Sequence, residues 1–160
     1  MEPAAQIVDA WRIQARITLY LLDNTPEEAL TVQPTERGRS VGRVYAHIHD
    51  NRVAWLEGYR DLAAGLQKLP ADAQHSRDAL HAALEASGAA VEALLTRALA
   101  EGKVKGFKPH PAAFLGYLIA HEAYHHGEIG LMLGQAGQRL PREVAYEMWE
   151  WKHFAGEAEP

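Results

Sequence analysis

The chain has 160 residues, no cysteine, and a formal net charge of −5 from 16 basic and 21 acidic side chains. This length suits one domain with a real hydrophobic core, and 48% hydrophobic with 23% charged residues is typical of a globular protein rather than a disordered one. The lack of cysteine excludes disulfides, thiolate zinc fingers, iron–sulfur clusters and a thiol nucleophile, and the negative charge argues against nucleic-acid binding.

Apolar residues recur with a period near 3.6 through most of the chain and seldom alternate with period two, so the sequence predicts helices. Ser40 suits the N-cap of the second helix, and Gly102 suits the end of the third. One helical turn is expected at 26–30, inside the first connection. The expected helices cover residues 3–22, 41–66, 76–101, 112–134 and 142–153.

Four helices of about 20 residues, followed by a shorter one, predict an all-α protein. The breaks between them are too short to hold a separate domain. We therefore expect an up-and-down four-helix bundle with a short extra C-terminal helix. The single domain covers residues 1–160, with a core at about 5–153 and a frayed tail at 154–160.

The fourth expected helix carries the sequence HEAYHHGEI at residues 121–129. His121 and His125 lie one helical turn apart on the apolar face, so both imidazoles are expected to point into the bundle. His126 points away from that face and is expected in solvent. Two neighbouring imidazoles in a bundle interior need partners and repel each other when protonated, and one divalent metal ion answers both requirements. Core histidines that only form hydrogen bonds are the alternative.

A metal site needs further ligands, and the second expected helix offers His47 and His49. Helical periodicity slightly favours His49, but both residues lie at the edge of the apolar face, so the choice stays open on this ground. A site with three histidines leaves at least one coordination position free, which is typical of catalytic rather than structural zinc. The remaining histidines are expected to be ordinary surface residues: His75, His81, His110 and His153.

Residues 121–125 also match H-E-x-x-H, the zincin motif in which the glutamate, here Glu122, activates water. In this interpretation Glu143 or Glu147 would serve as a further metal ligand. Zincins set this helix against a β-sheet, and no convincing strand precedes it here. Metal-assisted hydrolysis is therefore an alternative function.

Two motifs resemble the DinB/YfiT-like superfamily: SVGRVYAHI at 40–48, and HEAYHHGEI, which is similar to the family pattern H-x-x-x-H-R-G-Q-I. The resemblance implies a four-helix bundle in which His47, His121 and His125 hold a divalent metal, and so it selects His47 over His49. The chain departs from the family pattern at His126 and Glu128. Further similar segments are Trp55-Leu56, residues 137–141 and residues 148–151.

Members of that superfamily are known as transferases and isomerases that use a low-molecular-weight thiol such as bacillithiol, mycothiol or glutathione. The resemblance therefore implies an enzyme whose metal, zinc or nickel, activates a thiol for transfer to an electrophile. Because the chain has no cysteine, that thiol must come from outside the protein. A metal-binding bundle without catalysis, which serves structure or dimerisation, is the alternative.

Three further residues are candidates for the site. Glu128, one turn beyond His125, can orient a ligand, hold a water or act as a base, whereas an exposed ion pair is its alternative. Arg52 can bind an anionic substrate group or pair with an acid on a neighbouring helix. Asn51 can donate a hydrogen bond to a cofactor. A basic loop that can rim a pocket for an acidic thiol contains Lys103, Lys105 and Lys108.

The expected partners are a small-molecule substrate or thiol and a second copy of the chain. Bundles of this type often pair, and the four tryptophans are candidates for the core and for a homodimer interface. Apolar runs are too short for a membrane span, and no signal peptide is evident, so we expect a cytoplasmic protein with no membrane or nucleic-acid partner.

Overall fold

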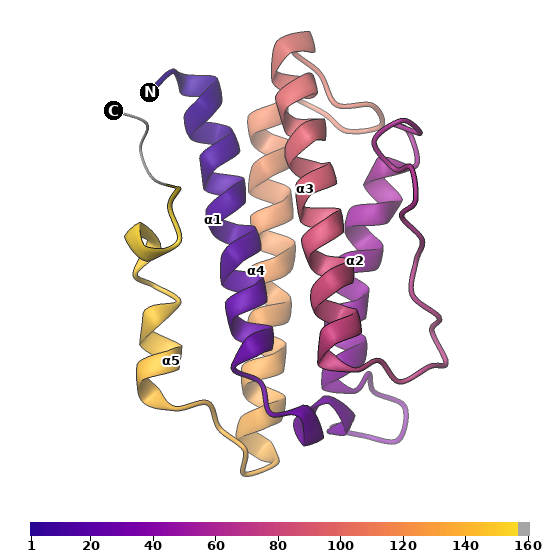
Figure 1. The fold of residues 1–160 in the computed structure, drawn as a ribbon, viewed down its shortest axis with the longest axis vertical. Helices are drawn as coiled ribbons and strands as arrows, with labels where there is room; N and C mark the ends of the chain where they lie inside the picture. The colour runs from indigo at the N-terminus through magenta and orange to yellow at the C-terminus, as the bar shows by residue number, and fades with distance from the viewer. Residues whose placement is uncertain (157–160) are drawn as a thin grey trace.

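The computed structural model describes residues 1–156. The regular secondary structure in this part of the chain is helical, apart from one isolated bridge between Val104 and Phe107. Helices α1 to α4 form a four-helix bundle and α5 is a short extra helix, as the sequence predicts (Figure 1). None of the helices within 1–156 combines the length and the apolar character needed to cross a membrane. The elements are α1 (Pro3–Asp23), the 3₁₀ helix η1 (Glu27–Thr31), α2 (Val41–Leu56), α3 (Arg77–Glu101), α4 (Pro111–Gln135), α5 (Arg142–Glu147) and η2 (Trp151–His153).

The helix ends follow from local chemistry. The Ser40 hydroxyl accepts a hydrogen bond from the backbone N–H of Arg43 at 3.3 Å and so caps α2, as expected. Gly102 ends α3 with φ of 71°, a left-handed conformation in which a side chain would be strained. Both signals were readable in the sequence because they act within one helical turn.

Helix α2 ends at Leu56 rather than at residue 66, and this changes how the chain crosses the bundle. The connection at 57–76 runs back along the bundle, so α2 and α3 point in the same direction instead of alternating (Figure 1). A helix of 16 residues is about 24 Å long, a distance that this connection can easily span. A helix extending to residue 66, as the sequence predicts, would leave only residues 67–75 for that return.

His49 holds the returning connection in place. Its ring nitrogens lie 2.9 Å from the carbonyl oxygens of Ala83 on α3 and Gln67 in the connection. The neighbouring Asp50 carboxylate accepts a hydrogen bond from the backbone N–H of Leu69 at 2.9 Å. These side chains at the edge of α2 therefore join the crossover to the bundle.

The core has two apolar parts with a polar layer between them. One part surrounds Trp11 and Phe114, and the other surrounds Tyr45 and Leu133. Between them along each helix lie buried polar side chains, which must find partners inside the protein because water does not reach them. The residues of this polar layer are Gln14, Thr18, Arg52, Ser87 and Glu122.

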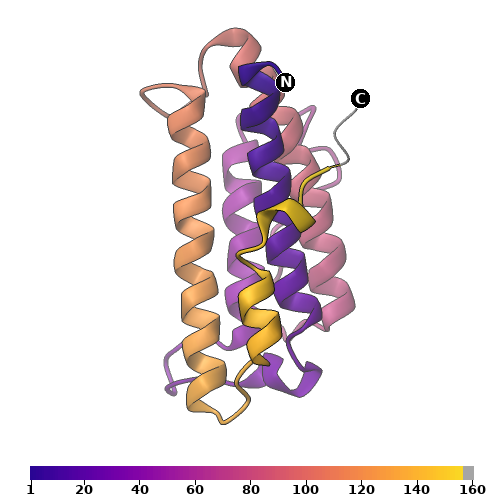
Figure 2. The same cartoon turned by 90° about the vertical axis from the view of Figure 1, so that its left-hand side faces the viewer.

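Helix α5 and the turn that follows it lie along α1 (Figure 2). Phe154 is buried against Ile13 and Ile17, and its carbonyl accepts a hydrogen bond from Arg16 at 2.6 Å. The sequence assigned residue 154 to a frayed tail, and the structure corrects this: an aromatic ring that reaches an apolar patch on α1 stays there. Residues 157–160, the rest of that expected tail, lie outside the described residues.

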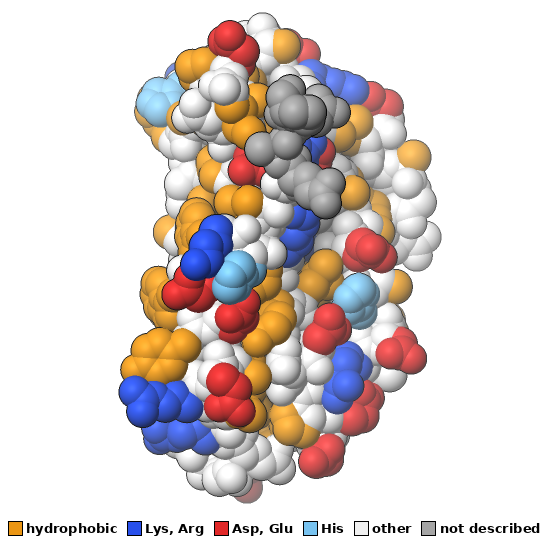
Figure 3. All heavy atoms as spheres, turned by 60° about the vertical axis from the view of Figure 1, so that its left-hand side comes forward, with side chains coloured by type: hydrophobic (Ala, Val, Ile, Leu, Met, Phe, Trp, Pro, Cys, Tyr) orange, Lys and Arg blue, Asp and Glu red, His pale blue; other side chains and the backbone are white. Residues whose placement is uncertain are grey.

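The four tryptophans divide between core and surface. Trp11 is fully buried and donates a hydrogen bond from its indole to the Gly88 carbonyl at 2.9 Å, and Trp55 packs among aromatic rings. Trp149 and Trp151 are 79% and 39% exposed. The face that carries α5 mixes hydrophobic, acidic and basic side chains (Figure 3). The homodimer stays a prediction.

Candidate metal centre

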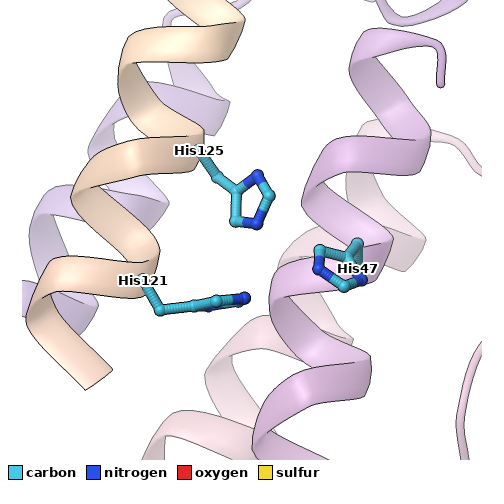
Figure 4. A group of neighbouring side chains, drawn as sticks. All are labelled: His47, His121 and His125. Atoms are coloured by element: carbon cyan, nitrogen blue, oxygen red, sulfur yellow. The ribbon is translucent and has the colours of Figure 1, made fainter. Parts of the chain in front are cut away.

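Three histidines from two helices meet beside the polar layer. His47 projects from α2, and His121 and His125 project from successive turns of α4 toward it (Figure 4). One nitrogen from each ring lies within 4.8 Å of the other two. The ring centroids are 4.6 Å apart for His121 and His125, 4.8 Å for His47 and His125, and 5.4 Å for His47 and His121. The structure thus forms one group from residues 74 positions apart (47 to 121).

The charge state of these rings suits metal binding. Burial lowers the pKa of His47 to about 4, and the charges of Arg39 and of the two other histidines act in the same direction. Burial and His125 likewise lower the pKa of His121. Both imidazoles are therefore neutral near pH 7, and a neutral imidazole presents the lone pair that binds a metal.

The group also fits an ion in size. Zinc–imidazole bonds of about 2.0–2.1 Å place two ligand nitrogens up to about 4 Å apart, so small ring rotations bring these three nitrogens onto one ion. Within residues 1–156, no fourth His, Asp or Glu joins the group. His47 and His121 are only half-buried, so the centre is open to solvent. Three neutral ligands with solvent access match an open metal centre rather than a closed structural one.

Glu128 contacts the centre through one of its histidines. Its carboxylate lies 2.7 Å from Nδ1 of His125, and His125 is buried while Glu128 is partly exposed. A carboxylate at Nδ1 favours the tautomer with the proton on that nitrogen, which leaves the Nε2 lone pair for a metal. Of the roles that the sequence suggested for Glu128, this contact favours the orientation of a ligand, and that role stays a prediction.

Replacing Glu128 with Gln is expected to weaken metal binding by about 10- to 100-fold, the usual effect of losing a carboxylate behind a metal-binding histidine. A glutamine keeps the size of the side chain but removes the charge that fixes the His125 tautomer. The measurement is a competition titration with a chromophoric chelator. The matched control is Glu147→Gln, which removes a glutamate bonded to His153 instead. Equal affinity in the wild type and the Glu128 variant would contradict this role.

His49 does not reach this group, because both its ring nitrogens face backbone carbonyls of other elements. The structure thus brings together the three histidines that the family resemblance implied, and periodicity alone had slightly favoured the wrong residue of the pair. Asn51 lies one turn beyond His47 and is partly buried, and among the described residues no hydrogen bond of its side chain is found.

Arg52 and Glu122 form a buried ion pair in the polar layer. Arg52 Nε donates to one carboxylate oxygen of Glu122 at 2.7 Å and Nη2 to the other at 3.0 Å, and both side chains are about 1–2% exposed. The remaining Arg52 nitrogen, Nη1, donates to the Leu84 carbonyl. Arg52 was expected either to bind a substrate or to pair with a neighbouring acid, and the structure shows the pair. Because the guanidinium is buried, a ligand cannot reach it.

Helix α1 completes this pair. Thr18 donates to Glu122 at 2.9 Å and lies 2.9 Å from Nε2 of His126, while Gln14 donates to Glu122 at 3.3 Å. Burial alone would raise the pKa of Glu122, but the charge and hydrogen bonds of Arg52 outweigh it and lower that pKa. Glu122 is thus held as a carboxylate by four hydrogen bonds from Arg52, Thr18 and Gln14, and it is not free to activate water, which disfavours the zincin interpretation.

His126 corrects another expectation. The sequence placed it in solvent because it points away from the metal face of α4, but α1 packs on that side and covers it. Burial lowers the pKa of His126 to about 4, so the ring is neutral. Its Nε2 lies within hydrogen-bond distance of the Thr18 hydroxyl, which also contacts Glu122. Only the position of α1 could reveal this, since α4 by itself shows an open side there.

The basic loop between α3 and α4 packs on the end of α2 rather than beside the histidines. The backbone N–H of Lys105 donates to the Tyr59 hydroxyl at 2.7 Å, and the Lys105 side chain lies against Gly58. Phe107 of this loop joins Trp55 and Tyr117, and the Tyr117 ring stacks on His121 with centroids 6.2 Å apart. Phe107 of the loop therefore supports the Tyr117 ring that stacks on His121.

The family comparison agrees with this arrangement. The family model described as "DinB family" matches residues 1–153. The chain belongs to the DinB family. This DinB-family chain is also 28% identical over 158 residues to the "Uncharacterized protein YrdA" of Bacillus subtilis (strain 168), covering 93% of this chain and 92% of that relative. No solved structure matches the chain significantly.

The sequence did not single out Arg39 and Arg43, two exposed arginines at the start of α2. Both line a small cavity with His47. The available signal was the spacing of Arg43, which precedes His47 by one helical turn and so shares its side of α2. Arg39 lies before the helix begins, where no periodicity applies.

Proposed function

We propose that this DinB-family protein holds a divalent metal, zinc or nickel, at His47, His121 and His125 and uses it to activate an external low-molecular-weight thiol toward an electrophile. The observation that carries the proposal is the group of three histidines, two of them half-exposed, with no further ligand from the described residues. The imidazole nitrogen of histidine binds both zinc and nickel readily.

Three neutral ligands leave the full positive charge of the ion in place. When bound, the ion supplies that charge to lower the pKa of a thiol beside it. In the transfer itself the thiol loses its proton, its sulfur forms a bond to an electrophilic carbon, and the leaving group departs with the electron pair of the broken bond. The protein supplies no thiol of its own, since it has no cysteine.

The roles of the chain's own residues follow from the contacts. The three histidines bind the metal ion, and Glu128 positions His125 by holding the proton at Nδ1. The Arg52–Glu122 pair anchors α4 to α2 at the turn that bears His121, which keeps the two helices in register. Tyr117 forms an apolar wall next to His121 that limits water on that side.

The test is turnover of 1-chloro-2,4-dinitrobenzene with bacillithiol, mycothiol or glutathione, followed by release of chloride and formation of the thioether. Zinc- or nickel-loaded protein is expected to exceed both the metal-free protein and the His125→Ala variant by about two orders of magnitude or more. The proposal would be refuted if the metal-loaded protein neither bound nor turned over a single one of the three thiols. If metal removal instead unfolds the protein, the site is structural.

A further inference from the structure

A small cavity lies directly beside the group of three histidines and shares His47 with it. Its volume is about 160 Å³. Arg39, Arg43, His47 and Asp50 line it from the side of α2, and residues 69–71 of the crossover close it from the other side. The return of the chain along α2, which the sequence did not predict, therefore creates this cavity.

The cavity carries a net positive charge. Two arginines and one acidic residue line it, and the carboxylate of that acid, Asp50, already accepts a hydrogen bond from the Leu69 backbone. Within residues 1–156, neither Arg39 nor Arg43 forms an ion pair or a side-chain hydrogen bond, whereas Arg12, Arg52 and Arg97 each pair with an acid. Two free planar donors at one small cavity suit a carboxylate, which a guanidinium binds through two parallel hydrogen bonds.

The cavity is also coupled to the metal centre. His47 belongs to both, since it lines the cavity and is one of the three grouped histidines. Ligand pockets for a whole small molecule measure about 300–1,000 Å³, so a cavity of 160 Å³ holds only one end of a ligand. A molecule with its acidic end in this cavity would have His47, one of the three histidines, directly beside it.

We propose that Arg39 and Arg43 bind a carboxylate of the substrate whose sulfur is activated at the three histidines. The substrate class is then an acidic thiol, with the carboxylate a few bonds from the sulfur. This assignment rests on the proposed thiol function and adds to it the group that the protein recognises. Arg39 and Arg43 would act as specificity residues that orient the thiol and discriminate against neutral ones.

The experiment compares 3-mercaptopropionate with its methyl ester on cobalt-substituted protein. Binding is followed by the thiolate-to-cobalt charge-transfer band, so the readout does not depend on turnover. The acid is expected to bind about 10- to 100-fold more tightly than the ester, the usual range for hydrogen bonds to a charged group. That preference should fall to near unity in Arg39→Gln and Arg43→Gln. It should persist in the control Arg60→Gln, which removes an exposed arginine after the end of α2.

The outcomes separate this proposal from the thiol function. If both thiols bind equally well, or if the preference survives in the Arg39 and Arg43 variants, the carboxylate subsite is refuted and thiol binding stands. If neither thiol reaches the metal, succinate is titrated against the protein and the amide signals of Ala46 and Ala71 are followed by NMR. Succinate shifts that vanish in Arg39→Gln would support the subsite without the thiol function. Unchanged signals would refute the carboxylate subsite, whereas the thiol function is decided by the three thiols named above.

Discussion

Replacing Arg52 with Met is expected to lower the free energy of unfolding by about 3–5 kcal/mol, the range found when one partner of a buried ion pair is removed. The methionine fills much of the same volume but leaves Glu122 as an uncompensated buried carboxylate. Thr18 and Gln14 still donate to that carboxylate, yet neither carries charge. Urea denaturation of metal-free protein, followed by circular dichroism, measures the effect.

A matched exposed pair provides the control. Arg12 and Glu92 lie 2.7 Å apart with 44% and 32% of their side chains exposed, and Arg12→Met is expected to cost no more than about 1 kcal/mol. The double variant Arg52→Met/Glu122→Gln should be more stable than Arg52→Met alone, because it removes the stranded charge. If the Arg52 and Arg12 variants lost equal free energy of unfolding, the buried pair would contribute no more to stability than the exposed one, which would contradict this prediction.

Alanine in place of His47, His121 or His125 is expected to abolish metal binding, with a loss larger than the roughly 10–100-fold that follows loss of an outer partner such as Glu128. Each substitution leaves only two imidazoles, and two neutral ligands hold a divalent ion poorly. Elemental analysis of dialysed protein and chelator competition measure the loss. His81→Ala is the control, because this histidine of α3 lies outside the group and faces Asp23.

The His49→Ala variant tests the choice between neighbouring histidines. It is expected to keep the metal and to destabilise the crossover, because its ring bridges Ala83 and Gln67. Hydrogen exchange at residues 66–70 should rise in this variant and not in His47→Ala. Retention of metal in His47→Ala together with its loss in His49→Ala would show that the group is wrongly assigned.

Local signals in the sequence were sufficient for most helix ends, but not for the last helix, which was expected over 142–153 and divides into α5 (Arg142–Glu147) and η2 (Trp151–His153). The start of α2 at Ser40, the end of α3 at Gly102 and the extent of α1, α3 and α4 were all predicted to within about two residues, because caps and apolar periodicity act within a turn or two. The end of α2 was predicted too late. Residues 57–66 carry apolar side chains such as Tyr59 and Leu62 at helical spacing, but these pack in the crossover against the bundle.

For this protein, the sequence by itself determined most of the helices, the bundle and a pair of histidines one turn apart on α4 that could bind a metal. Periodicity left open which residue of α2 completes that group, and the resemblance pointed to His47; the tertiary structure gives the physical reason, since the crossover occupies His49 and leaves His47 facing α4. It also decided that α1 covers His126 and that Arg52 meets Glu122. The cavity at Arg39 and Arg43 arises in the same way. Each of these contacts joins elements distant in the chain, and their identity depends on helix direction and packing, which helical periodicity does not encode.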